Sequence, residues 1–191
     1  MTIKMNQSYP SFEEIIEAQK KLVSMQQQEW LNHDLYTPQF WLLIFLMIVP
    51  WFIWWRIVRK SRLCEILLYG MFVLTIVTTL DEFGCQLILW EYAYDVEPLF
   101  PRLIPINFTV LPVAYMLIYQ YFETWRSYLI ANLIMATLFS FVAEPILVWI
   151  GIYKLYHWEY VYSLPIYVVI AVLVKWLIQA IMRVQRENCV K

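Results

Sequence analysis

The sequence has very little charge for its length. Only 15% of its 191 residues are Asp, Glu, Lys or Arg, whereas a soluble domain carries about 25%. The net charge of −1 provides no basic surface, so a nucleic-acid partner is not expected. There are only three glycines, and the three cysteines form no CxxC pair or disulfide framework. These absences argue against a charged soluble domain, a nucleic-acid-binding module and a small disulfide-stabilised fold.

The sequence also lacks the motifs of common enzyme and cofactor sites. It contains no HExxH, GxSxG, P-loop or GxGxxG pattern, so neither a zinc protease nor a nucleotide-binding site is indicated. The two histidines, His33 and His157, do not have the spacing of a metal motif, and we expect no metal site. The residues identify neither a catalytic group nor a cofactor, which favours a non-enzymatic protein.

Apolar and aromatic residues are abundant. Hydrophobic residues make up 62% of the chain, and there are ten Trp, fourteen Tyr and eleven Phe. Aromatic rings gather where helices pass through the two interfaces of a membrane. A helix needs about 20 apolar residues to cross a bilayer. Runs of this kind predict an all-α integral membrane domain over residues 38–191, with spans at about 39–58, 63–90, 103–122, 125–152 and 164–182.

Residues 1–37 differ from the rest of the chain in being polar. Ser11 and Glu14 have the spacing of a capping box, which predicts the start of a helix. Apolar residues at spacings of three and four continue to about Asn32, and Pro38 follows. We expect an amphipathic helix that lies on the membrane surface or packs on the rest of the protein.

The Lys and Arg residues predict how the chain is oriented. If the basic run after the first span is cytoplasmic, five spans place eight of the fourteen basic residues on that side. These are Arg56, Arg59, Lys60, Arg62, Arg126, Arg183, Arg186 and Lys191. Short basic loops stay in the cytoplasm. We therefore expect a multi-pass protein of a bacterial plasma membrane, with its N-terminus outside and its C-terminus inside.

The second and third spans resemble the fourth and fifth at an offset of about sixty residues. The resemblance rests on residues of the same kind at matching positions. Glu82 and Glu144 each lie well into one helix, and Leu103–Ile106 corresponds to Ser163–Ile166 at the start of the next. This pattern predicts two helical hairpins that form a parallel repeat. The alternative is that any pair of hairpins needs turn prolines and interfacial aromatics.

Several polar side chains fall within the predicted spans, where each ionisable group costs about 2.5–3.5 kcal/mol. If the repeat is real, Glu82 and Glu144 lie at one height and cannot both ionise cheaply. The interpretation of Lys175 is that it pairs with one of the acids, and the alternative is a side chain that snorkels to the membrane interface. A structural role in joining helices is the alternative to a ligand site. The candidate ligand-binding residues are Asp81, Glu82, Gln86, Trp90, Tyr92, Asn107, Glu144 and Lys175.

Two resemblances to known families rest on local motifs. Asp81–Gly84, Trp90–Tyr92, Pro105–Asn107 and Tyr162–Tyr167 resemble, over nearly the full chain, an uncharacterised family of small five-span membrane proteins of spore-forming bacteria. This resemblance implies a place in a spore or envelope complex, with other membrane proteins or further copies of the chain as partners. It implies no activity.

The second resemblance is to the membrane-embedded heterodimeric lycopene cyclases. It rests on Asp81-x-x-Gly84, then Trp90-x-Tyr92 and then Pro105-Ile106. Asn107-Phe108 stands where that family has two glutamates, which are its natural proton donors. The resemblance therefore implies a shared scaffold for an apolar, elongated ligand rather than a shared reaction.

The sequence as a whole favours a multi-pass membrane protein that binds a small molecule, lipid or ion between two helical hairpins. The alternatives are a membrane enzyme on an apolar isoprenoid-like substrate and a cation- or proton-coupled permease subunit. Membrane lipid is the expected surroundings in every case, and an apolar small molecule or a cation is the expected ligand.

Overall fold

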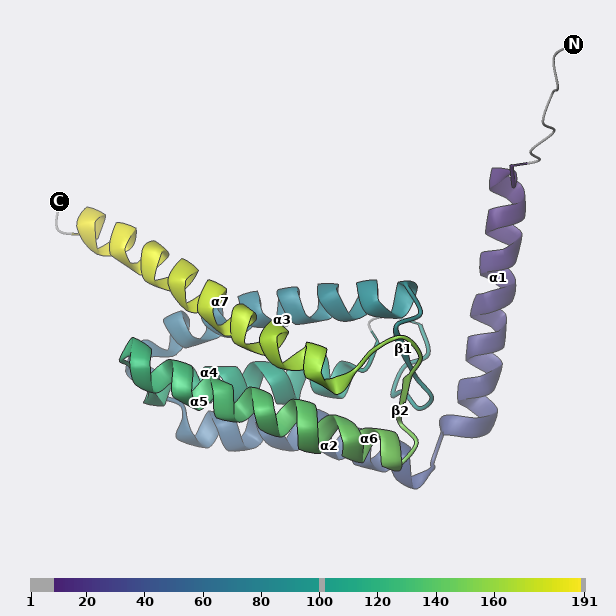
Figure 1. Ribbon diagram of the computed structural model, residues 1–191, viewed down its shortest axis with the longest axis horizontal. Helices are drawn as coiled ribbons and strands as arrows, with labels where there is room; N and C mark the ends of the chain where they lie inside the picture. Colours follow the sequence, from purple (N-terminus) through teal and green to yellow (C-terminus); the bar gives the residue numbers. More distant parts are fainter. Residues whose placement is uncertain (1–8, 100–101, 190–191) are drawn as a thin grey trace, which may run out of the picture.

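The structure is a computed structural model that describes residues 9–99 and 102–189, and Lys191 lies outside the described residues. Long helices lie side by side in a bundle (Figure 1). Four of them are long and apolar enough to cross a membrane, by length and composition. They cover Pro38–Ile57, Lys60–Gln86, Trp125–Trp149 and Tyr160–Asn188. The prediction of a helical, multi-pass membrane protein is confirmed at this level.

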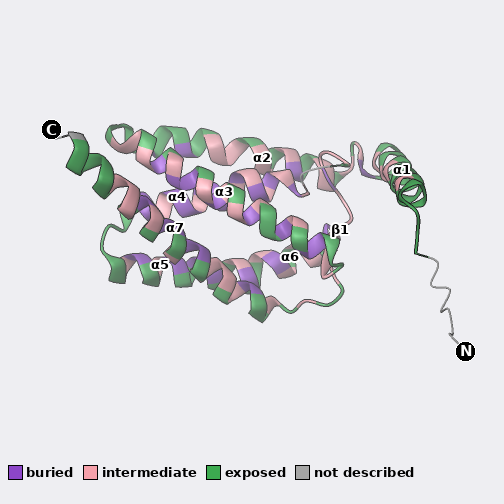
Figure 2. Cartoon of the chain, turned by 90° about the horizontal axis from the view of Figure 1, so that it is seen from above, coloured by how far each residue is buried: buried purple, intermediate pink, exposed green. Residues whose placement is uncertain are grey.

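The N-terminal helix α1 (Phe12–Glu29) begins at the predicted capping box. The Ser11 hydroxyl accepts a hydrogen bond from the Glu14 N–H at 3.2 Å, and the Glu14 carboxylate accepts one from the Ser11 N–H at 2.7 Å. A π-helical segment, η1 (Trp30–Asp34), continues α1. No residue of α1 is buried, and the helix runs crosswise to the bundle (Figures 1 and 2).

The first half of the bundle contains two long helices and a shorter one. Helix α2 (Pro38–Ile57) continues through Pro50. A 3₁₀ turn, η2 (Lys60–Arg62), leads to α3 (Leu63–Gln86). The return helix is the π-helical segment η3 (Pro105–Val110) followed by α4 (Leu111–Tyr121), and seven of the eleven residues of α4 are buried. The return helix is therefore the central helix of the bundle.

The second half also consists of a helix, a strand and a return helix, but its π-helical segment lies before the strand and not after it. Helix α5 (Trp125–Leu138) continues through the π-helical segment η4 (Phe139–Ala143) into α6 (Glu144–Trp149). Helix α7 (Tyr160–Cys189) then returns along the bundle. Each of η3 and η4 ends two residues before a proline, Pro112 and Pro145 respectively. Proline has no N–H for the α-helical ladder, and a π-helical stretch is one way in which a helix adapts to such a break.

Two short strands join the loops of the two halves. Strand β1 (Trp90–Tyr92) pairs antiparallel with β2 (Tyr153–Leu155), so that Tyr92 lies opposite Tyr153. Helix α3 therefore ends at Gln86, four residues before the end of the predicted span. We call the end of the bundle that carries these strands the β end. The opposite end, which carries Arg62 and Arg183, we call the basic end.

Tyrosine hydroxyls connect the helices in the core. Tyr69 on α3 and Tyr128 on α5 share a hydrogen bond of 2.6 Å, and Tyr128 also donates to the Ala171 carbonyl of α7 at 2.9 Å. Tyr115 on α4 donates to the Tyr167 carbonyl at 2.7 Å. Buried residues lie on the facing sides of these helices, and exposed ones lie outward (Figure 2). The outward residues are largely apolar, as expected for a surface in contact with lipid.

Candidate functional site: two buried acids in an apolar pocket

An apolar pocket of about 260 Å³ lies at the β end, between the two halves of the bundle. We call it the β-end pocket. Segments from α3, η3, α6 and α7 form its walls, together with both strands. Leu80, Phe83 and Leu87 line it and are also exposed on α3, so the pocket reaches the outer surface of the bundle. Its polar side chains are Asp81, Trp90, Tyr92, Asn107, Glu144, Tyr153, Trp158, Ser163 and Tyr167.

Asp81 is held by three neutral donors. The Trp90 indole N–H and the Tyr92 hydroxyl donate to its Oδ1 atom at 3.0 and 2.6 Å. The Asn107 amide donates to its Oδ2 atom at 2.7 Å. The side chains come from α3, β1 and η3, so the buried carboxylate connects three elements. Four of the predicted candidates, Asp81, Trp90, Tyr92 and Asn107, are therefore in direct contact.

Gly84 allows Trp90 to reach Asp81. Asp81 and Gly84 lie one turn apart on α3, and a Cβ atom at Gly84 would overlap the Trp90 indole ring. The indole ring therefore lies directly against the backbone of α3. It also packs edge-on against Trp158, with the ring centroids 4.7 Å apart. Trp158 precedes α7, so this contact brings the second half of the bundle to the same place.

Glu144, the first residue of α6, is held in a similar way. The Tyr167 hydroxyl donates to its Oε1 atom at 2.9 Å, and the Ser163 hydroxyl donates to its Oε2 atom at 3.0 Å. Ser163 in turn accepts a hydrogen bond from the Trp158 indole N–H at 3.0 Å. Asp81 is thus oriented by an indole, a hydroxyl and an amide, and Glu144 by two hydroxyls.

The two acids receive matching contacts from the two return helices. Asn107 lies two residues after Pro105 and donates to Asp81, whereas Tyr167 lies two residues after Pro165 and donates to Glu144. Asn107 is part of η3, and Glu144 directly follows η4. Single-turn π-helical segments often occur at functional sites, and here η3 lines the pocket while η4 ends one residue before Glu144.

No Lys or Arg among the described residues forms an ion pair with either acid, since the ion pairs involve other carboxylates. A carboxylate offers about four acceptor positions. Asp81 accepts three hydrogen bonds and Glu144 two, so acceptor capacity remains. A group that enters the pocket is therefore best matched if it donates hydrogen bonds or carries a positive charge.

The hydroxyl of Tyr92 keeps its proton in this arrangement. Burial raises the pKa of Tyr92 well above its ordinary value, and the nearby Asp81 carboxylate adds to the rise. Burial likewise raises the pKa of Tyr153, with Glu144 and Asp81 adding to it. Both phenols are therefore neutral donors at physiological pH.

Three of the predicted candidates lie outside the pocket: Gln86, Glu82 and Lys175. Gln86 is exposed and donates to the Glu82 carboxylate at 3.1 Å, and neither residue lines the pocket. The interpretation that placed Glu82 beside Glu144 is corrected in this respect, because Asp81 is the residue of α3 that shares the pocket with Glu144. Consecutive residues on an α-helix point about 100° apart, so only one of the two acids can face inward.

Lys175 lies at the other end of the bundle and pairs with neither acid of the pocket. Its ammonium group donates to the carbonyl oxygens of Phe122 and Glu123 at 3.3 and 3.0 Å and lies 3.9 Å from the centroid of the Tyr128 ring. Phe122 is the C-cap of α4. The buried cation therefore offsets the negative end of the α4 dipole, which replaces the expected pairing with an acid.

Four polar residues of the site were not among the sequence-based candidates: Tyr153, Trp158, Ser163 and Tyr167. The offset of sixty residues between the two halves pairs Asn107 with Tyr167, so this signal was present in the sequence. Within the described residues, no cluster of three or more His, Cys, Asp or Glu side chains is arranged to hold a metal ion. The chain matches no protein-family model, no curated protein and no solved structure.

Proposed function

We propose that this protein binds a small apolar molecule in the β-end pocket, through a group that donates hydrogen bonds or carries a positive charge. The single observation that supports this most strongly is the pair of buried acids, Asp81 and Glu144, held only by neutral donors in an otherwise apolar pocket. Burying an ionisable side chain at this depth of a membrane costs free energy, and residues of this kind usually mark a functional site.

The shape and lining of the pocket narrow the class of ligand. Its aliphatic walls favour an apolar body, and the rings of Trp90, Trp158 and Tyr153 can stabilise a cationic group through their π faces. An anionic group would be repelled by both acids. A protonated amine or a hydroxyl on an apolar molecule fits these conditions, and a carboxylate does not.

The proposal includes a fifth membrane span formed by η3 and α4. These segments contain six and eleven residues, or about 25 Å of helix, slightly less than the hydrocarbon thickness of about 30 Å. A central helix that is covered by its neighbours needs less apolar length than one in contact with lipid. With five spans, the basic loops favour an outer N-terminus and an inner C-terminus, and α1 is placed to lie along the outer membrane surface.

The proposal also treats the two halves as a parallel repeat. The matching donors after Pro105 and Pro165 and the pairing of β1 with β2 support it. Binding sites of membrane proteins that contain repeats often lie between the repeats. The β-end pocket has this position.

A membrane enzyme on an apolar isoprenoid-like substrate is the second candidate. One observation favours it: acids and aromatic rings face the same apolar pocket. A reaction through a carbocation would require both, because the acid donates a proton and the rings stabilise the cation. A permease subunit that uses the same acids is a third. Asn107 bonds to Asp81 and supplies no acid of its own, so binding remains the leading proposal.

Thermal unfolding of the purified protein in neutral detergent tests the ligand class. Octylamine and octanoate have equal chain lengths and opposite charges. The proposal predicts that octylamine raises the melting temperature of the wild type and that octanoate does not. Asp81→Asn combined with Glu144→Gln should abolish the rise, whereas Glu82→Gln, one residue from Asp81, should retain it. Equal stabilisation by both compounds would refute the proposed ligand class.

A further inference from the structure

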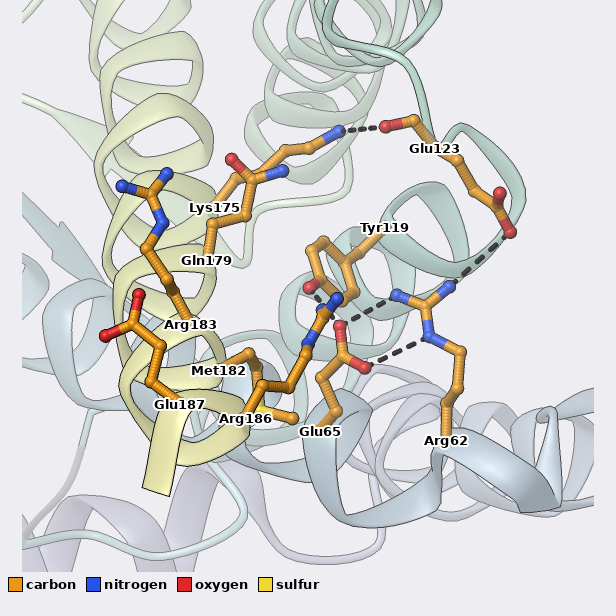
Figure 3. A pocket seen from close by; sticks show the side chains of 10 residues that line it. All are labelled: Arg62, Glu65, Tyr119, Glu123, Lys175, Gln179, Met182, Arg183, Arg186 and Glu187. Carbon is orange, nitrogen blue, oxygen red and sulfur yellow. Dashed lines mark hydrogen bonds and ion pairs between the residues drawn. The ribbon is translucent and has the colours of Figure 1, made fainter. Parts of the chain in front are cut away.

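A second cavity, of about 570 Å³, lies at the basic end of the bundle, far from the β-end pocket along the helices. We call it the basic-end cavity. It lies where η2 and the first turn of α3 meet the last turns of α4 and α7. In Figure 3, Lys175 and Arg186 extend from α7 towards the side of Glu65 and Tyr119, whereas Arg183 and Glu187 extend to the other side of the helix. The lining of the cavity is strongly polar, in contrast to the β-end pocket.

The acids on one wall of this cavity are already paired. Glu65 accepts hydrogen bonds from Arg62 at 2.8 and 3.1 Å and a further one from the Tyr119 hydroxyl. Glu123 accepts a hydrogen bond from Arg59 at 2.7 Å and lies 3.5 Å from a second nitrogen of Arg62. Fork-to-carboxylate pairs of this kind hold both charges in place, so this wall is electrically balanced.

The wall formed by α7 is not balanced. Arg183 and Arg186 both line the cavity from α7. Neither forms an ion pair within 4.0 Å with a carboxylate of the described residues. Figure 3 shows Arg186 reaching towards Glu65 and Tyr119 across the cavity. Glu187 is the acid that α7 contributes to the lining, so arginine exceeds acid on this wall.

Lys175 adds a buried positive charge deeper in the same cavity. It is 2% exposed, and it lines the cavity two helical turns before Arg183. An ammonium group has three N–H donors, and carbonyl oxygens take two of those of Lys175. The Tyr128 ring also lies 3.9 Å from this ammonium group, but no carboxylate of the described residues lies within ion-pair distance of it.

We propose that the basic-end cavity binds a phosphate group, supplied by an anionic lipid headgroup or by a soluble phosphate compound. The guanidinium groups of Arg183 and Arg186 and the ammonium group of Lys175 supply several N–H donors around the cavity. A phosphate presents two or three anionic oxygens, and the planar arginine fork matches their spacing. Basic pockets between membrane helices are also typical places for anionic headgroups. The proposal does not depend on the function of the β-end pocket.

The test is thermal unfolding of the full chain in neutral detergent with four additions. These are phosphatidylglycerol, phosphatidylcholine with the same acyl chains, inorganic phosphate and pyrophosphate. If the phosphate group belongs to a lipid, phosphatidylglycerol should raise the melting temperature by at least about 2 °C. If it belongs to a soluble compound, inorganic phosphate or pyrophosphate should do so. Either result supports the site and identifies the source. Equal effects of the two lipids without an effect of phosphate would overturn it.

Paired variants separate the cavity from the general charge of this end. Arg183→Gln with Arg186→Gln should weaken the apparent affinity about tenfold or more. Arg56→Gln with Arg126→Gln removes the same charge from exposed positions outside the cavity and should change it little. Glu187→Gln should strengthen it severalfold, about two- to fivefold, and it provides a test even if the double variant does not fold. Equal losses in the two double variants, or no gain with Glu187→Gln, would contradict the proposal.

Discussion

Asn107, the third residue of η3, donates a hydrogen bond of 2.7 Å to Asp81 on α3. The same amide donates to the Arg102 carbonyl at 3.0 Å. Both Asn107 and Asp81 are buried. The bond therefore fixes the start of the return helix against α3 and also orients a carboxylate of the β-end pocket. The Asn107 side chain therefore contributes both to the packing of η3 on α3 and to the candidate site.

Replacement of Asn107 by Leu should lower the free energy of unfolding by about 1–3 kcal/mol, because a buried carboxylate oxygen then loses its donor. Gln86→Leu is the control, since Gln86 is exposed and bonds to Glu82 outside the pocket. It should change stability by no more than about 0.5 kcal/mol. Chemical or thermal unfolding in detergent measures both. Equal losses in the two variants would contradict the role of Asn107.

Gly84→Ala should disturb the site through Trp90. The added methyl group overlaps the indole ring, so the ring must move and its hydrogen bond to Asp81 is lost. We expect a destabilisation of about 1–3 kcal/mol. At Gly70 the corresponding methyl group meets only the side chain of Met116, which is flexible and can adapt. Gly70→Ala should therefore cost less, and the reverse order in thermal unfolding would count against this account.

The sequence predicts the long helices well, and five of its candidate residues line one pocket. Apolar runs and the capping box depend on local spacing, which a single sequence shows directly. The choice between Asp81 and Glu82 is different, because both faces of a membrane helix are apolar and the usual periodicity does not reveal the inner face. Gly70 and Gly84 lie on the buried face of α3, as Asp81 does. These two glycines are therefore the feature of the sequence that indicates the inner face.

Lys175 shows a second limit of sequence reasoning. It lies near the middle of the predicted fifth span, so it was expected near the acids. Helix α7 extends from Tyr160 to Cys189 and projects beyond the neighbouring helices (Figure 1). Lys175 is therefore level with the turn between α4 and α5. Helix lengths relative to one another come from packing, which sequence patterns do not contain.

Asp95 provides a prediction about pH. It is 9% exposed and accepts a hydrogen bond from the Leu103 N–H at 3.0 Å. Burial raises the pKa of Asp95 well above its ordinary value, with Asp81 and Asp34 adding to the rise and the Leu103 N–H and Arg102 opposing it. The folded chain thus binds this proton more tightly than the unfolded chain, so stability falls as pH rises above the unfolded-state pKa of about 3.9.

Asp95→Asn keeps an oxygen acceptor and removes this titration. The melting temperature of the variant relative to the wild type should therefore increase with pH, from about pH 4 upwards. Thermal unfolding of both proteins at a series of pH values measures the difference. If the difference stays constant over the series, Asp95 does not hold its proton more tightly in the folded protein.

The fifth span is tested by cysteine labelling in a cysteine-free version of the chain. Gln27→Cys on α1 and Asn188→Cys on α7 are both at exposed positions. Five spans place them on opposite sides of the membrane, and an outer N-terminus makes only Gln27→Cys react with an impermeant thiol reagent on intact cells. Labelling of both positions, or of neither, would mean an even number of spans. Reaction of Asn188→Cys alone would reverse the orientation.

The central claim is that Asp81 and Glu144 hold a ligand in the β-end pocket, and mass spectrometry of what co-purifies in mild detergent tests it most directly. The wild type and Glu82→Gln should carry the same apolar molecule with a hydrogen-bond donor or positive charge. Asp81→Asn and Glu144→Gln should carry it at about tenfold lower occupancy, the effect of losing about 1.4 kcal/mol of binding free energy. Equal occupancy in all four proteins, or a wild type that carries only phospholipid and detergent, would contradict the claim.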